Sequence, residues 1–118
     1  MNRSTYRTII LITAVITGLI HLVLLNVSTM GSTGSIDLLF TLNGLGFLAL
    51  AGALFFEPPF LKGYEKWVIY AFMAFTLATI VAWVAVGARS VLGYLTKLDE
   101  AILLVALGLY LRDNTQDG

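Results

Sequence analysis

The side chain with the widest chemical range in this sequence is its single histidine, His21. Its imidazole titrates near neutral pH and can also bind a metal. His21 lies inside segment 8–27, about twenty residues that are otherwise almost wholly apolar. Because a titratable group at that depth is costly in hydrocarbon, we expect His21 to have a polar partner or a function.

Three further polar or aromatic side chains fall at a similar depth in other apolar segments. At 1.5 Å per residue, His21 lies roughly 9 Å and Asn43 roughly 10 Å inside the same end of their helices. Trp83 lies near that height, and Thr79 lies one turn deeper. The sequence therefore predicts one polar layer of His21, Asn43, Thr79 and Trp83.

Four roles for His21 follow from this pattern. The first is structural, as a hydrogen-bond partner of Asn43 that fixes helix register. The others are a ligand of a metal or haem iron, a proton relay, and a quinone contact. Since the chain has no cysteine and one histidine, a metal or haem site would need ligands from another chain. We expect no metal and no cofactor in the chain itself.

Composition indicates an integral, multi-pass protein of the cell membrane. The 118 residues are 58% hydrophobic and 12% charged, with a mean hydropathy of +0.90. Seven basic residues balance seven acidic ones, so no basic excess points to nucleic acid. The sequence contains no HExxH motif and no Ser/His/Asp set, and we expect no enzyme activity from the chain alone.

The predicted fold is all-α, a single domain over 1–118 built as an up-down bundle of four transmembrane helices. The predicted spans are about 8–27, 36–56, 67–88 and 98–111. Pro58 and Pro59 end the second span, and Thr96 to Asp99 resembles a capping box that starts the fourth.

The distribution of basic residues predicts the orientation. One side carries five of them and the other side carries Arg89 and Lys97, so both termini are expected in the cytoplasm. The five are Arg3, Arg7, Lys62, Lys66 and Arg112.

Charges of the outer loops are expected above the polar layer. They are Asp37, Arg89, Lys97, Asp99 and Glu100. Such a set commonly forms a solvated cap with a weak local ion pair. Alternatively, Arg89 and Asp99 form a lid over the layer.

Small residues predict the packing faces of the helices, because they let two backbones approach closely. They are Ala14 and Gly18 in the first span, Gly44, Gly46 and Gly52 in the second, and Ala74, Ala78 and Ala82 in the third.

Several short motifs carry a resemblance. They are IHLVL in the first span, LNGLGFLAL in the second, a late Trp in the third and LGYLTKLDEAILLVALGLYL around the fourth. On these the chain resembles small archaeal four-helix membrane proteins. In size and layout it is similar to accessory subunits of archaeal membrane oxidoreductases, including the copper-dependent ammonia monooxygenase. The resemblance implies a scaffolding role, with His21, Asn43, Trp83 and Asp99 at the shared positions.

The leading prediction for function is a non-catalytic accessory subunit of a larger membrane complex, packed against other membrane subunits and the lipid bilayer. The first alternative is a small homo-oligomeric carrier or channel lined by His21 and Asn43. The second is a haem- or quinone-contacting subunit that acts through His21.

Overall fold

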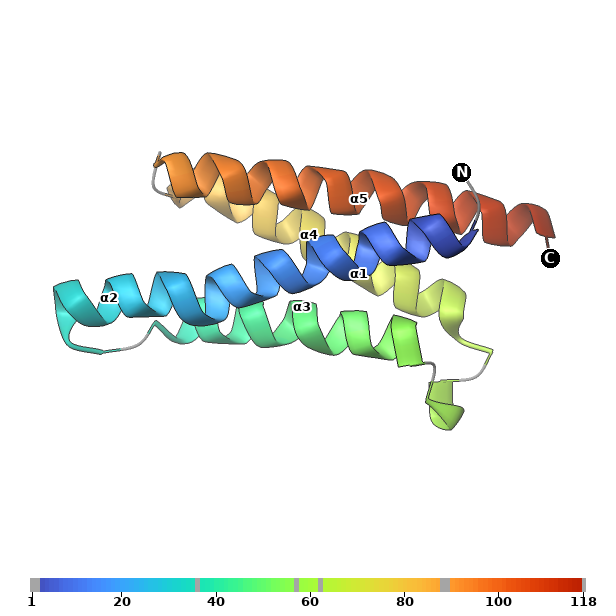
Figure 1. The fold of residues 1–118 in the computed structure, drawn as a ribbon, viewed down its shortest axis with the longest axis horizontal. Helices are drawn as coiled ribbons and strands as arrows, with labels where there is room; N and C mark the ends of the chain where they lie inside the picture. The colour runs from blue at the N-terminus through green and yellow to red at the C-terminus, as the bar shows by residue number, and fades with distance from the viewer. Residues whose placement is uncertain (1–2, 36, 57, 62, 88–89, 118) are drawn as a thin grey trace.

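The fold is a bundle of long helices, seen in a computed structural model (Figure 1). The structure describes residues 3–35, 37–56, 58–61, 63–87 and 90–117. The elements are α1 (Arg3–Leu19), a π-helix (Ile20–Leu24), α2 (Leu25–Thr33), α3 (Leu38–Phe56), a 3-10 turn (Pro59–Leu61), α4 (Glu65–Val86) and α5 (Val91–Asp117).

The first three elements form one continuous helical rod. This rod is longer at both ends than the predicted span 8–27, because Ser and Thr residues beyond Val27 stay helical. Thr29 and Thr33 donate their hydroxyls to carbonyls one turn earlier. The rod ends at Gly34, whose φ of 80° is a left-handed conformation that glycine adopts without a Cβ clash.

The start of α3 is close to its prediction. The Asp37 carboxylate accepts the backbone N–H of Phe40 at 3.0 Å, which is an N-cap contact. At the other end of α3, the Arg7 guanidinium donates to the Phe55 carbonyl at 3.0 Å. A cation there stabilises the negative end of the helix and joins the start of α1 to the end of α3.

The fourth helix begins earlier than predicted. The Ser90 hydroxyl accepts the backbone N–H of Gly93 at 3.0 Å, so the cap lies directly before Val91. The predicted capping box at Thr96 is wrong, since the Thr96 hydroxyl donates backwards to the Leu92 carbonyl within a formed helix. The error arises because that back-bonded threonine and the acid at Asp99 imitate a helix start.

Each helix buries positions separated by three or four residues, which is the pattern of antiparallel helix bundles. The rod packs against α3 and α5, and α4 also packs against α3 and α5. In α5 the buried face is Thr96, Glu100, Leu103, Leu107 and Tyr110; in α4 it is Ile69, Phe72, Thr76 and Thr79.

The predicted small-residue faces divide into two groups. Ala14, Gly18 and Gly44 are buried where α1 meets α3. A Cβ on Gly44 would lie 2.7 Å from the Gly18 carbonyl oxygen, so the two backbones are in close contact there. A Cβ on Gly46 would clash with the Phe75 ring of α4, whereas one on Gly52 would meet only Phe56, at 3.9 Å.

The alanine series of α4 has the opposite placement from the one predicted. Ala74, Ala78 and Ala82 are exposed on the outside of the bundle. The face of α4 that packs inside the chain instead carries the larger Phe72 with Thr76 and Thr79. The predicted packing face of these alanines is therefore not a buried face of this chain.

Three helical stretches are long and apolar enough to cross a membrane: Ser4–Thr33, Leu38–Phe56 and Glu65–Ala85. The predicted fourth crossing, in α5, is not among them. Lys97, Asp99 and Glu100 interrupt the apolar run of that helix.

Candidate functional site

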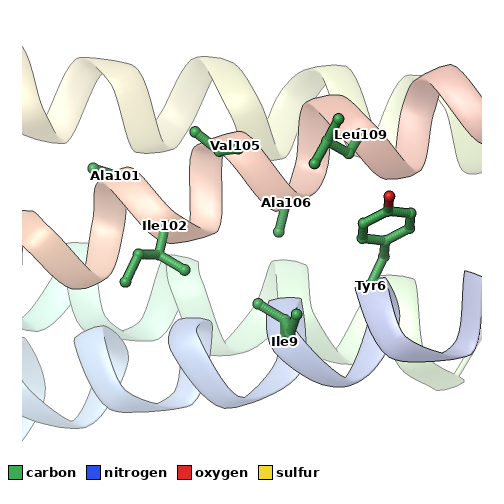
Figure 2. A pocket seen from close by; sticks show the side chains of 7 residues that line it. All are labelled: Tyr6, Ile9, Ala101, Ile102, Val105, Ala106 and Leu109. Carbon is green, nitrogen blue, oxygen red and sulfur yellow. The ribbon is translucent and has the colours of Figure 1, made fainter. Parts of the chain in front are cut away.

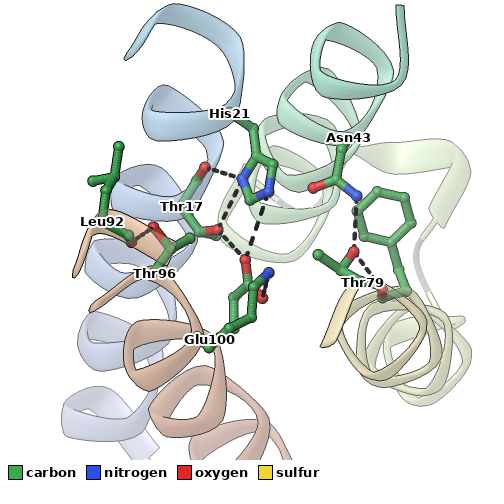
Figure 3. Close-up of polar contacts among 9 residues, drawn as sticks. Thr17, His21, Asn43, Thr79, Leu92, Thr96 and Glu100 are labelled. Atoms are coloured by element: carbon green, nitrogen blue, oxygen red, sulfur yellow. Dashed lines mark hydrogen bonds and ion pairs between the residues drawn. The ribbon is translucent and has the colours of Figure 1, made fainter. Parts of the chain in front are cut away.

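A buried polar cluster joins α1 to α5. The Thr17 hydroxyl donates to Glu100 Oε2 at 2.6 Å, although the two residues are 83 positions apart. Both side chains are fully buried. His21 lies one turn beyond Thr17, and its Nε2 is 3.9 Å from the same carboxylate oxygen. Figure 3 shows the three side chains converging between the two helices.

The hydrogen bonds of His21 determine its tautomer. Nδ1 lies 2.8 Å from the Thr17 carbonyl oxygen, which can only accept a hydrogen bond. Nδ1 therefore carries a proton and donates it to that oxygen. Since the ring is fixed in this way, Nε2 faces Glu100 and is the nitrogen whose proton can vary.

Lys97 is the fourth member of the cluster and lies on the same helix as Glu100, α5. Its Nζ donates to Glu100 Oε1 at 2.5 Å, so each oxygen of the carboxylate has a partner. The Lys97 side chain is 11% exposed and that of Glu100 is 0% exposed. The prediction of both residues as solvated outer-loop charges is wrong, because helix α5 turns them towards α1.

Asp99 lies beside this pair and is only partly buried. Among the residues that the structure describes, no group hydrogen-bonds to its buried Oδ2 atom. The predicted lid between Arg89 and Asp99 involves a residue outside the described part of the chain.

The hydrogen bonds and ring contacts that the structure gives the other predicted layer residues are not with His21. Asn43 Nδ2 donates to Thr79 Oγ1 at 2.8 Å, between α3 and α4. Trp83 packs edge-on against Tyr94, with ring centroids 5.1 Å apart. Of the predicted layer, His21 thus belongs to a cluster around Glu100, and Asn43 and Thr79 form a second cluster; Figure 3 shows both.

Two aromatic rings of α3 lie beside the imidazole of His21. The ring centroids of Phe40 and Phe47 lie 6.3 and 6.1 Å from that of His21. These rings contribute no hydrogen-bond donor or acceptor to the imidazole. The polar partners of His21 therefore come from α1 and α5.

A third polar cluster lies nearer the loop that follows α2. Asn26 Oδ1 accepts the backbone N–H of Asp37 at 2.8 Å, and Asn26 Nδ2 donates to Thr41 Oγ1 at 2.9 Å. Asp37 thus donates its backbone N–H to a side chain of α2 and caps the start of α3 with its carboxylate. It is not part of the cluster around Glu100.

The π-helix brings His21 and Asn26 to the same side of the rod. The Leu25 N–H donates to the Ile20 carbonyl, a bond of π type. Such a turn accommodates one extra residue. Without it the position one turn after His21 would be Leu25, and Asn26 would rotate away from α3. Single π-helical turns are frequent at functional sites.

An apolar groove lies farther along the same pair of helices. It measures about 310 Å³ and is lined by Tyr6 and Ile9 of α1 and by α5 side chains between Ala101 and Leu109 (Figure 2). Carbon atoms form almost all of its lining. Among the described residues, no three His, Asp or Glu side chains gather to hold a metal ion.

Sequence reasoning missed Glu100 and Lys97 as members of the buried site. One signal was present: Glu100 shares a helical face with Leu103, Leu107 and Tyr110, at intervals of three and four residues. That face is apolar and must be buried, so the carboxylate on it is buried too.

Comparison with known proteins identifies the family and no activity. No curated protein and no solved structure matches the chain. One family matches residues 2–111, nearly the whole length, and it is described as a family of unknown function. The resemblance to accessory subunits of archaeal oxidoreductases therefore stays a prediction. By this match, the chain belongs to the family of unknown function DUF7475.

Proposed function

We propose that this protein is a four-span integral membrane protein with both termini in the cytoplasm. The three long apolar helices support it, and α5, with 27 residues, is longer than two of them. The burial of Lys97 and Glu100 also supports it, because these two charges of α5 then contact protein and not lipid. With Lys97 inside the bundle, Arg89 is the only predicted outer basic residue left, which strengthens the positive-inside asymmetry.

Within the membrane, we propose a non-catalytic role as a subunit packed against the helices of another membrane protein. The observation that carries this proposal is the exposed alanine face of α4, formed by Ala71, Ala74, Ala78, Ala82 and Ala85. Small residues at these intervals let two helix backbones approach closely in lipid. In the part of the chain that the structure describes, these alanines are exposed on the outside of the bundle, so the face is open to a second protein.

The test is gentle extraction from native membranes, followed by blue-native electrophoresis and mass spectrometry of the co-migrating chains. The proposal predicts a band much larger than one copy, with reproducible partner subunits. A band containing only this chain would contradict it.

A matched pair of variants tests the alanine face itself. Ala78→Leu enlarges an exposed position, so it should leave the bundle folded and release the chain from the large band. Leu77→Ala changes the size of an exposed neighbour outside the alanine face and should leave the band intact. Equal behaviour of the two variants would argue against the alanine face as the contact.

A second candidate is a homo-oligomeric carrier or channel, and one observation favours it. Asn43 Oδ1 is buried, and no described residue donates a hydrogen bond to it. A buried amide oxygen of this kind has the capacity to accept a polar solute. Flux into reconstituted vesicles that Asn43→Leu abolishes would favour this function over the subunit role.

A further inference from the structure

We propose that His21 Nε2 and Glu100 Oε2 form a buried proton-exchanging pair, with Thr17 as the residue that positions the carboxylate. The inference goes beyond the subunit role and does not depend on it. The ligand of this site is a proton. The chain holds it between two side chains from helices at opposite ends of the sequence.

The geometry selects one nitrogen for this exchange. Nδ1–H is held by the Thr17 carbonyl at 2.8 Å, and a deprotonated Nδ1 would face that oxygen lone pair to lone pair. Nε2 has no such constraint and points at Glu100 Oε2 across 3.9 Å. If the two side chains moved about 1 Å closer, Nε2 and Oε2 would be within the range of a charge-assisted hydrogen bond.

The step is balanced within the pair. When His21 is protonated, the proton on Nε2 moves to a lone pair of Glu100 Oε2: the N–H bond breaks with its electrons left on nitrogen, and an O–H bond forms. An imidazolium and a carboxylate become a neutral imidazole and a carboxylic acid. The reverse step restores them, so no other reactant is needed.

Thr17 holds the accepting oxygen in place. Its hydroxyl donates to Oε2 at 2.6 Å, on the same oxygen that faces His21. Lys97 holds the other oxygen, at 2.5 Å. The carboxylate is thereby fixed with one oxygen towards the imidazole. Thr17 is a positioning residue, because it need not itself gain or lose a net proton.

Among the described residues, the charged groups next to the pair lie on α5. They are Lys97, which is ion-paired with Glu100, and Asp99, the neighbour of Glu100 in sequence. Facing His21, α3 contributes the rings of Phe40 and Phe47, and α1 contributes Thr17. In the described part of α4 the charged side chains are Glu65 and Lys66, in its first turn and far along the helix from this site.

The single histidine makes a direct test practical. The full chain, labelled with ¹⁵N-histidine and purified in detergent, gives the two imidazole nitrogen signals of His21 alone. Over a pH titration, the proposal predicts that Nδ1 stays protonated and that Nε2 is the nitrogen that titrates. Loss of the Nδ1 proton in place of the Nε2 proton would overturn it.

Variants test the link to Glu100. Glu100→Gln removes the charge at nearly constant volume, and should displace the Nε2 transition by at least about one pH unit, a tenfold change in proton affinity. Thr17→Val should also displace it, and Thr17→Ser, which keeps the hydroxyl, should restore it. Thr76→Val is the matched control, because Thr76 is equally buried but donates only to Phe72 in α4.

A transition that stays within about 0.3 pH units in both Glu100→Gln and Thr17→Val would overturn the proposal, since a charge this close must alter the affinity. If Glu100→Gln fails to fold, the nitrogen assignment in the unaltered chain and the Thr17→Val and Thr17→Ser pair still decide the outcome.

Discussion

Thr17 donates its hydroxyl to Glu100 across 2.6 Å, and this contact links the first helix of the chain to its last. A fully buried carboxylate is costly unless it is paired and hydrogen-bonded. Here Lys97 supplies the opposite charge and Thr17 supplies the second donor. The apolar bundle thus contains a charged centre whose partners come from two helices.

The Lys97–Glu100 pair should be far more sensitive to losing one partner than to losing both. Glu100→Leu leaves the Lys97 ammonium buried without its partner, and we expect a loss of about 3–5 kcal/mol of stability. The double change Lys97→Met with Glu100→Leu removes both charges, so it should recover most of that loss. Thermal unfolding in detergent measures the comparison. A double variant less stable than the single one would argue against a buried ion pair.

Two glycines of α3 provide a matched test of helix packing. Gly44→Ala places a Cβ 2.7 Å from the Gly18 carbonyl oxygen and 2.8 Å from the Leu22 nitrogen, so the backbones of α1 and α3 must separate. This variant should lower the unfolding temperature. Gly52→Ala meets only Phe56, at 3.9 Å, and should be neutral or stabilising by up to about 1 kcal/mol through helix propensity. Equal effects of the two changes would contradict the close contact at Gly44.

The proposed membrane topology can be tested by thiol labelling, because the chain has no cysteine of its own. Ser32→Cys and Ser90→Cys should react with a membrane-impermeant maleimide in intact cells. Phe60→Cys, at an exposed position in the opposite loop, should react only after permeabilisation. A cysteine appended after Gly118 should behave like Phe60→Cys if α5 crosses. Labelling of that appended cysteine in intact cells would remove the fourth span.

The helical fold was predictable from apolar run length, but the site was predictable only in part. His21 drew attention because it is the single histidine in an apolar run, and the structure places it among polar partners. Glu100 was grouped with the solvated outer-loop charges because the local sequence around Thr96 to Asp99 imitates a helix start, which places Glu100 in the polar first turn of the predicted span. Its helical face was visible in the sequence, but its partner Thr17 lies 83 positions away, and no local pattern identifies it.

Other features follow from tertiary contacts alone. The π-helix at Ile20–Leu24 has no propensity signal in five mostly aliphatic residues, and it exists where His21 and Asn26 both face other helices. The alanines of α4 were predicted to form a packing face because small residues let helices approach closely. The sequence could not say whether that packing is within the chain or against another one.

A double-mutant cycle on Thr17 and Glu100 tests the central claim, that a buried polar contact joins α1 to α5. Stability in detergent would be measured for the unaltered chain, Thr17→Val, Glu100→Gln and the double variant. A hydrogen bond to a charged group is worth about 1.5–3 kcal/mol, so we expect a coupling energy of that size. Additive effects of the two changes, with no coupling between them, would contradict the contact.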